Sequence, residues 1–594
     1  MSFNRYYQSE LSALRELGLQ FAERNPALAP FLGQGGRDPD VERLLEGFAF
    51  LTGRLREKLD DELPELAHSL VHLLWPHYMR PLPACAMLQF DPLKRTGPAL
   101  SVARHTAVEA RELDGVSCRF RTAFDTEVQP LALTALRYGP RGEGASLVLR
   151  LGLTVDGHLG ELHLARLRLH LCGERYLSQA LYLALLRQVT RIGVVLLDRH
   201  DQALQDPQGR ELDPLALDPQ SLQPLGFADD QALIPAAENS LPGYRHLQEY
   251  FAFPDKFLFV ELSGLDALRR LPDALLKRAS GLELRLELAR NHLQHLNPSL
   301  DNVRLHCVPV VNLFKHDAQP IRLDGRQDQY RVLPAGHSPQ HCGVYAVDQV
   351  QGWRPGGQGY RQYVPFESFL HDEPAPQAPP FYAVRQQLGL LDDELQTYLR
   401  FAPVPADGQE TLSIELTCTN QNLPRRLALG DICQPCEGMP EALTFRNIGV
   451  ATPNYPPPLR HDFLWQLIRH LSLNYLSLRD IQTLRTLLAT YDLPRYHDPQ
   501  AARTSRRRLD ALRQIRQQPV DRLLRGLPVR GIRSELTLDT DGFLGEGELF
   551  LFASVLNEFF ALYSSVNAYH ELHVISSQGE SYRWTPRLGQ RPLL

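Results

Sequence analysis

Residues 38–60 read DPDVERLLEGFAFLTGRLREKLD, and this stretch decides the fold of the first part of the chain. Asp38 is a suitable N-cap, Pro39 suits the first helical position, and Asp40 places an acid in the first turn. Apolar residues then recur at intervals of three and four, which predicts a long helix with one apolar face. The residues of that stripe are Val41, Leu44, Leu45, Phe48, Thr52, Leu55 and Leu59.

The residues before this stretch predict a helix of the same kind, which prolines at positions 26 and 30 end. A third apolar helix is expected between residues 64 and 75, before the proline at position 76. The apolar stripe of the first helix consists of Tyr7, Leu11, Leu14, Gly18 and Phe21.

These helices are long and their apolar seams are narrow, which is typical of helices that join a bundle. Few helical partners lie nearby in the sequence, so two alternatives stay open. Either helices of other chains complete the bundle, or the helices form a self-contained three-helix domain. Under the first alternative, the predicted bundle interface consists of Tyr7, Leu11, Leu14, Phe21, Val41, Leu44, Phe48 and Leu55.

Beyond the prolines at positions 81 and 83, the apolar period changes from 3.6 to 2, which indicates strands. Alternating leucines at 147–155 and 162–171 flank a turn at Asp156-Gly157, with one phase slip at Ala165-Arg166. This pattern predicts an antiparallel β unit with a bulge or kink.

The rest of the chain mixes both periods, with connectors rich in turn-forming residues at 201–224 and 351–380. Strands are expected at 282–288, 412–418 and 532–538. Helices are expected at 178–191, 462–478, 480–491, 499–516 and 552–559.

The predicted fold class is α+β with several domains, in which an N-terminal helical arm contributes to an intermolecular bundle and mainly antiparallel β and α+β domains follow. The predicted domains are a helical core-bundle segment over 1–80, β-rich domains over 81–200 and 201–375, and an α+β domain over 376–594.

The chain of 594 residues has a formal net charge of −6, with 43% hydrophobic and 22% charged residues. Such a composition is typical of a globular protein with more than one core, and it lacks the basic excess that points to nucleic acid. The start has no signal-peptide pattern, and no stretch approaches the roughly 20 apolar residues of a spanning helix. We therefore expect a soluble cytoplasmic protein without direct membrane insertion, whose eight cysteines stay reduced.

Candidate metal ligands are few and form incomplete sets. Cys433 and Cys436 make a single C-x-x-C without a second pair, so packing or loop cysteines are favoured over a zinc site. His68 and His72 are four apart on a predicted helix, but Ser69 stands where the metalloprotease motif requires Glu.

The stretch from Asp539 to Gly542 resembles part of a calcium loop, but Phe550 stands at the twelfth position, so a plain turn is predicted. The glycine-rich stretch from Gly352 to Gly359 lacks the Walker lysine and the dinucleotide spacing. The sequence therefore predicts no catalytic, metal or cofactor-binding residues.

A basic run is predicted to lie on one helix, where Leu509, Leu512 and Ile515 form the apolar face. Its arginines are therefore expected on the solvated or partner-facing side, rather than at a nucleic-acid site. They are Arg503, Arg506, Arg507, Arg508, Arg513 and Arg516.

An aromatic block is expected to pack in the core, with a partner-binding patch as the alternative. It consists of Tyr250, Phe251, Phe253, Phe257 and Phe259.

Characteristic blocks of sequence run in order along the whole chain. At the N-terminus they are FNRYYQSELSALRELGLQFAERNPALAPFL from Phe3, DPDVERLLEGFAFLTGRLREKLDDELPEL from Asp38 and LLWPHYMRPLPA from Leu73. Later blocks are CRFRTAF from Cys118, LQEYFAFPDKFLF from Leu247, CVPVVNLFKHDAQPI from Cys307, LSLNYLSL from Leu471 and YRWTPRLGQRPLL from Tyr582. On these blocks the chain resembles the TssF family, also called ImpG or VasA, of bacterial type VI secretion system baseplate components.

The resemblance implies a wedge in which two TssF copies and one TssG share a core helical bundle. It also implies that the wedge binds TssK and TssE, surrounds the VgrG hub and supports sheath and tube assembly at the inner face of the inner membrane. No enzymatic activity and no cofactor are implied.

Two other function classes stay open. One is a wedge protein of a phage-like contractile tail, which neighbouring genes would distinguish. The other is a metal-dependent hydrolase that uses Cys433, Cys436 and nearby histidines, which stoichiometric bound zinc would support.

Overall fold

The computed structural model divides into two compact units, which are described separately: Met1–Leu74 with Arg460–Leu471, and Trp75–Leu459 with Ser472–Leu594. The predicted four-domain division stays a prediction. The structure describes residues 2–24, 39–60, 70–72, 76–95, 97–206, 208–235, 242–291, 293, 295–324, 327–354, 359–366, 380–389, 394–402, 410–459, 464–465, 467–468, 477–524, 527–564 and 568–589.

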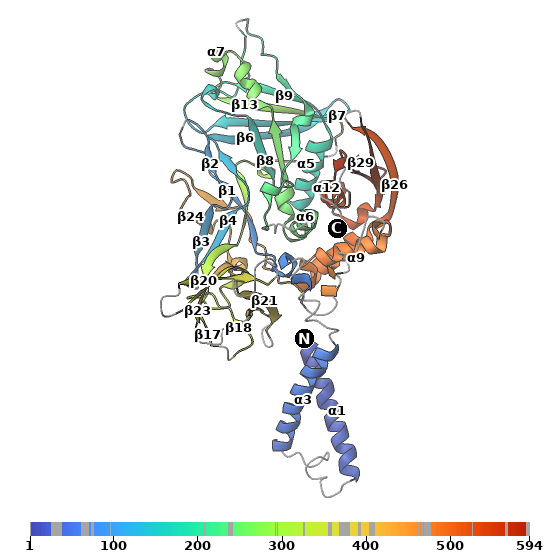
Figure 1. Ribbon diagram of the computed structural model, residues 1–594. Coiled ribbons are helices and arrows are strands. Elements are labelled where there is room, and N and C mark those ends of the chain that lie inside the picture. The colour runs from blue at the N-terminus through green and yellow to red at the C-terminus, as the bar shows by residue number, and fades with distance from the viewer. Residues whose placement is uncertain are drawn as a thin grey trace. The chain divides into compact units, whose positions relative to one another are not determined.

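The first unit contains the two long helices that the sequence predicts (Figure 1). They are α1 (Ser2–Arg24) and α3 (Pro39–Asp60). Of the third helix expected between residues 64 and 75, the structure describes only residues 70–72, which are helical; the rest lies outside the described residues. The same holds for most of the helix expected over 462–478, where residues 464–465 and 467–468 are helical.

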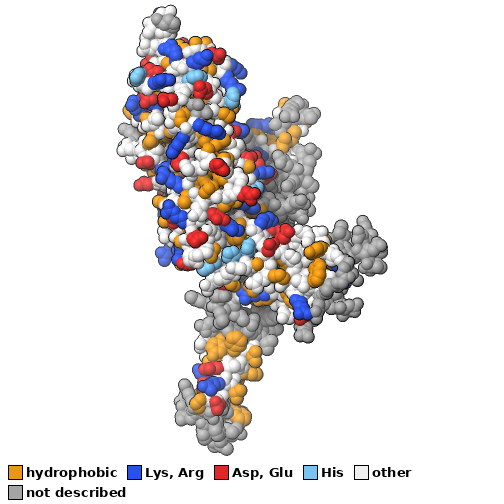
Figure 2. Space-filling model, turned by 90° about the vertical axis from the view of Figure 1, so that its left-hand side faces the viewer, with side chains coloured by type: hydrophobic (Ala, Val, Ile, Leu, Met, Phe, Trp, Pro, Cys, Tyr) orange, Lys and Arg blue, Asp and Glu red, His pale blue; other side chains and the backbone are white. Residues whose placement is uncertain are grey.

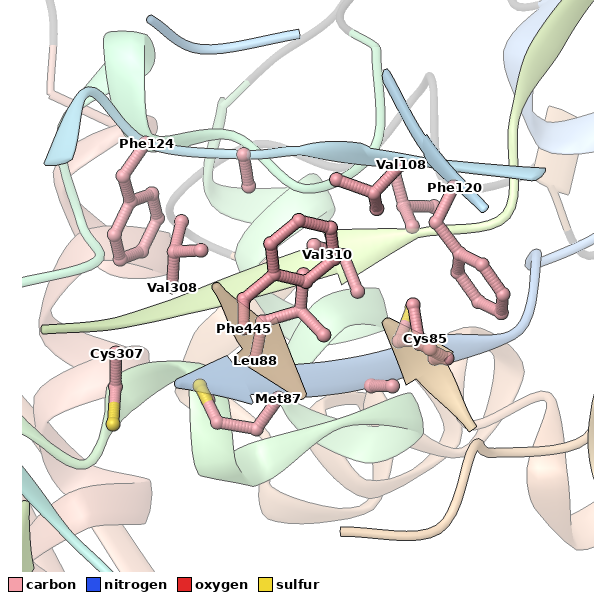
Figure 3. Close-up of a cluster of buried hydrophobic side chains, with 14 of the residues drawn as sticks. Cys85, Met87, Leu88, Val108, Phe120, Phe124, Cys307, Val308, Val310 and Phe445 are labelled. Atoms are coloured by element: carbon pink, nitrogen blue, oxygen red, sulfur yellow. The ribbon is translucent and has the colours of Figure 1, made fainter. Parts of the chain in front are cut away.

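The centre of the second unit is a six-stranded sheet in the order β24-β3-β4-β15-β1-β25. Its strands come from distant parts of the sequence, and their buried apolar side chains belong to one cluster, part of which Figure 3 shows. The strands are β1 (Cys85–Phe90), β3 (Ala107–Leu113), β4 (Val116–Thr122), β15 (Cys307–Val311), β24 (Ile432–Pro435) and β25 (Phe445–Asn447).

A five-stranded sheet, in the order β10-β9-β13-β7-β6, lies at one end of the second unit (Figure 1). Its strands are β6 (Leu131–Arg141), β7 (Gly144–Leu153), β9 (Val189–Leu197), β10 (Leu215–Leu217) and β13 (Gly281–Leu288). Residues of β7 alternate between buried and half-buried along most of its length, as its sequence period predicts.

A four-stranded sheet follows the order β11-β12-β8-β14. It comprises β8 (Arg166–Leu171), β11 (Leu222–Pro224), β12 (Phe259–Ser263) and β14 (Val303–Arg304). A small two-stranded sheet pairs β2 (Leu100–Val102) with β5 (Thr126–Val128).

The expected antiparallel unit of residues 147–155 and 162–171 is wrong. β7 pairs with β6 and β13, whereas β8 pairs with β12 and β14, so the two strands belong to different sheets. The phase slip at Ala165-Arg166 is the point where β8 begins, not a bulge within a hairpin. Strand periodicity is local, but the choice of partner depends on distant segments.

An eight-stranded sheet lies at the opposite end of the second unit from the five-stranded sheet (Figure 1). Its order is β16-β23-β19-β20-β21-β22-β18, with β17 also paired to β23. The strands are β16 (Phe314–Asp317), β17 (Ile321–Leu323), β18 (Tyr330–Arg331), β19 (Gly343–Trp353), β20 (Tyr360–Pro365), β21 (Phe381–Leu388), β22 (Leu395–Ala402) and β23 (Glu410–Thr419).

The last sheet combines a long hairpin with three shorter strands. They are β26 (Leu512–Leu524), β27 (Leu527–Leu538), β28 (Tyr569–Ser576), β29 (Ser581–Arg583) and β30 (Arg587–Leu588). The helices of the second unit are α5 (Arg175–Arg187), α6 (Pro242–Ala252), α7 (Asp273–Leu276), α9 (Ile481–Tyr491), α10 (Pro494–His497), α11 (Pro499–Asp510) and α12 (Glu546–Ala561).

The helix expected over 499–516 is wrong in its last turns, because α11 ends at Asp510 and β26 begins at Leu512. Leu512 and Ile515 are buried in the sheet, where they lie opposite Leu538 and Leu536 of β27. Their spacing of three favours a helix, because a regular strand would place the two side chains on opposite faces. A register shift between Leu512 and Gln514 brings both to the same face of β26.

The aromatic block packs in the core, which confirms the favoured interpretation. Tyr250, Phe253, Phe257 and Phe259 are buried, and Phe251 is half-buried beside Tyr250.

Candidate assembly interface

α1 and α3 pack against each other, and their buried residues are small or apolar. Leu11 is 5% exposed, and Ala49 and Gly53 are buried. Small side chains at these two positions allow two helix backbones to approach closely. Arg15 donates to Glu42 across the pair at 2.6 Å, so the buried contact is flanked by an ion pair.

The opposite side of α3 carries large apolar side chains that this chain leaves exposed. Leu44 is 73% exposed, Phe48 56% and Leu51 62%. Their spacing of i, i+4 and i+7 places them on one stripe, which we call the α3 outer face. Leu17 and Phe21 are also exposed on α1. Figure 2 shows hydrophobic side chains gathered on the surface of this helix pair.

The structure separates the eight predicted interface residues into different environments. Leu11 is buried within the chain, whereas Tyr7 and Leu14 are half-buried. Phe21, Leu44 and Phe48 are exposed, and the side chains of Val41 and Leu55 lie outside the described residues. That these residues contact other subunits stays a prediction.

Two exposed residues of this surface were not predicted. Leu51 lies seven residues after Leu44, and Leu17 lies between Leu14 and Phe21 at the same helical spacing. The helical period of the two apolar stripes would have allowed both positions to be predicted from the sequence.

The two cysteines of the C-x-x-C stretch lie at the edge of the six-stranded sheet. Cys433 lies on the edge strand β24, and Cys436 follows its end. Burial raises the pKa of the Cys436 thiol to about 11. Within the part of the chain that the structure describes, no three His, Cys, Asp or Glu side chains are grouped to hold a metal ion.

The stretch after Asp539 forms a single turn of 3₁₀ helix, η11 (Thr540–Gly542), in agreement with the predicted turn. Arg513 binds the Asp539 carboxylate, and the Glu546 carboxylate accepts hydrogen bonds from the hydroxyls of Ser576 and Tyr582. These oxygens therefore serve internal contacts. Among the helices that the structure describes, none combines the length and apolarity that crossing a bilayer requires.

Comparison with known proteins identifies the same relationship along nearly the whole chain. The family model described as "Type VI secretion system, TssF" matches residues 1–591. The type VI secretion system component TssF1 of Pseudomonas aeruginosa is 31% identical over 642 residues, which cover 99% of this chain and 99% of the relative.

Two solved structures contain a chain whose fold is similar to that of this protein. A chain of the TssK-TssF-TssG baseplate subcomplex matches with a TM-score of 0.75 and 32% identity, over 93% of this chain and all of that chain. A chain of the type VI secretion system baseplate complex matches with a TM-score of 0.66 and 29% identity, over 99% of this chain and all of that one. The protein belongs to the TssF family of the type VI secretion system.

Proposed function

We propose that this protein is a non-catalytic wedge subunit of the type VI secretion system baseplate, whose α3 outer face is covered by helices of other subunits. The observation that carries the proposal is the exposed stripe of Leu44, Phe48 and Leu51 on a helix of a TssF-family chain. Contiguous exposed apolar side chains of this kind mark interaction surfaces.

The partners are those of the family. One of the similar structures is a TssK-TssF-TssG baseplate subcomplex, which supports TssG and TssK as partners here. In the proposed wedge, two TssF copies join one TssG, TssE links the wedge to the sheath, and the wedges surround the VgrG hub. The assembly lies at the cytoplasmic face of the inner membrane, which it reaches through its partners.

The α3 outer face is suited to a bundle because its apolar residues keep a helical period. Complete burial of one such side chain contributes about 1.5–3 kcal/mol. The three side chains together therefore contribute at most about 4.5–9 kcal/mol. This is comparable with the roughly 4–15 kcal/mol cost of association, so further contacts of the partner must add to it.

The test is a double substitution, Leu44→Asp with Phe48→Asp, in a chain co-expressed with TssG. Both positions are exposed in the isolated chain, so we expect it to fold as before. Burying two carboxylates against apolar neighbours is strongly unfavourable, so TssG no longer co-purifies. Affinity purification followed by mass measurement of the complex shows whether TssG is still bound.

A matched control is Leu429→Asp with Val450→Asp, which changes two equally exposed apolar residues of the second unit. The control is expected to retain TssG. A complex that survives the α3 double substitution intact would show that this face does not form the shared bundle.

A further inference from the structure

Two arginines of α11 have neither an ion pair nor a side-chain hydrogen bond within the described structure. The guanidinium groups of Arg503 and Arg506 are exposed, and no carboxylate of the described residues pairs with either. By contrast, Arg508 pairs with Glu548 at 2.5 Å, and Arg513 with Asp539 at 2.5 Å. The basic run therefore includes arginines with internal roles, and on α11 it leaves Arg503 and Arg506 available to another molecule.

Arg503 and Arg506 lie along a groove of about 760 Å³. They are three residues apart on a helix, so both side chains leave α11 on the same side. Four small residues also line the groove. These are Pro499, Ala502, Ala511 and Gly542.

The walls of this groove are fixed by internal contacts. Arg507 donates from Nε and Nη2 to the carbonyl oxygen of Asp541, at 2.9 and 2.6 Å. A Cβ on Gly542 would lie 2.2 Å from the Cβ of Ala511, so glycine is what allows η11 to approach α11 this closely. The groove is consequently preorganised, which lowers the entropic cost of binding.

We infer that this groove binds an extended acidic segment of another baseplate subunit, whose carboxylates pair with Arg503 and Arg506. This inference rests on the proposed function. Guanidinium groups bind carboxylates through paired hydrogen bonds, and both groups here are free to do so. Asp510 and Asp541 also line the groove, and their carboxylates select against a continuous polyanion. A peptide with separate carboxylates can avoid them, whereas a nucleic-acid backbone carries a phosphate at every residue.

The first experiment places an amine in the groove of the assembled wedge. The single variants Arg503→Lys and Arg506→Lys are assembled with the co-expressed partners and treated with a carbodiimide, which joins an amine to a carboxylate in direct contact. Mass spectrometry of the digest is expected to identify a cross-link from position 503 or 506 to an Asp or Glu of another subunit. Arg270→Lys, an exposed arginine of the second unit without an ion pair in the described structure, is the control.

The second experiment reverses the charges with Arg503→Glu and Arg506→Glu together. We expect the double variant to keep the thermal stability of the wild type, and the wedge to lose the cross-linked subunit about ten times faster on dilution. Reversing the cross-linked carboxylates to lysine should restore the original rate. The pair Arg270→Glu with Arg331→Glu controls for total charge, because both residues are exposed elsewhere in the unit.

The outcomes separate this inference from the proposed function. A wild-type chain that forms no wedge contradicts the proposed function, whereas a wedge that yields only intrachain cross-links and tolerates the charge reversal contradicts the groove assignment alone. A 12-nucleotide thymidine oligomer that binds the free chain and is lost on charge reversal would assign the groove to nucleic acid instead.

Discussion

At the scale of single residues, the buried pair Glu249 and Lys256 shows how a charge is stabilised inside the second unit. Both side chains are 0% exposed, and Lys256 donates to the Glu249 carboxylate. The backbone N–H groups of Leu233 and Ile234 donate to the other carboxylate oxygen at 2.8 and 3.0 Å. The carboxylate thus ties residues 233–234 to α6, which carries Glu249.

Replacing Lys256 with Met removes the cation and leaves the Glu249 carboxylate buried among fewer partners. We expect the free energy of unfolding to fall by about 3–5 kcal/mol, as for other buried pairs that lose one member. Urea denaturation followed by far-UV circular dichroism measures the change. Adding Glu249→Gln should recover part of the loss, and a single variant as stable as the wild type would contradict the assigned role of the pair.

At the scale of elements, two glycines illustrate when a helix requires the smallest residue. A Cβ on Gly547, in the first turn of α12, would lie 2.4 Å from the carbonyl carbon and oxygen of Gln179 in α5. A Cβ on Gly47, within α3, would meet nothing within 4 Å. The close packing of α12 and α5 therefore requires glycine at position 547. Gly47, by contrast, only adds conformational freedom to the unfolded chain.

The two alanine substitutions should have opposite effects. Gly547→Ala must displace backbone atoms of α5, which costs about 1–3 kcal/mol. Gly47→Ala should stabilise α3 by about 0.5–1 kcal/mol through helix propensity. Hydrogen exchange of peptides from α12 and α3 measures each change locally, which avoids assuming that the two units unfold together. Equal protection in both variants and the wild type would contradict the packing argument.

At the scale of the whole molecule, the α3 outer face and the net charge have opposite effects on association between copies. A net charge of −6 keeps copies apart, but exposed apolar side chains on α3 favour association. The exposed side chains lie on a helix that packs against α1, so their exposure agrees with the proposed cover by another subunit.

Without its partners, the purified chain should therefore self-associate at micromolar concentrations. Light scattering coupled to size-exclusion chromatography is expected to give a mass above that of one chain. Leu44→Asp with Phe48→Asp should return it to the mass of a monomer, because charge on the α3 outer face prevents apolar contact. If the wild-type chain stays monomeric and binds no hydrophobic dye, the α3 outer face is not an interaction surface.

Local sequence patterns determined many of the elements. The helical period and the Pro39 start predicted α1 and α3, and the alternation of residues 147–153 predicted β7. The interval 480–491 likewise corresponds to α9, where the Asp480 side chain accepts from the N–H of Thr483 as an N-cap. These features depend on neighbours within a few residues, so they can be predicted without the fold.

By itself, then, the sequence determined the periods, the helix starts, the family resemblance and which residues require burial. Only the tertiary structure decided that β1 pairs with both β15 and β25, and that Leu11 is covered by its own chain whereas Leu44 is not. It also placed Arg503 and Arg506 beside one groove while committing Arg508 and Arg513 to internal ion pairs. The physical reason is that side-chain period is a local property, whereas strand partners and covering surfaces depend on segments far apart in the chain.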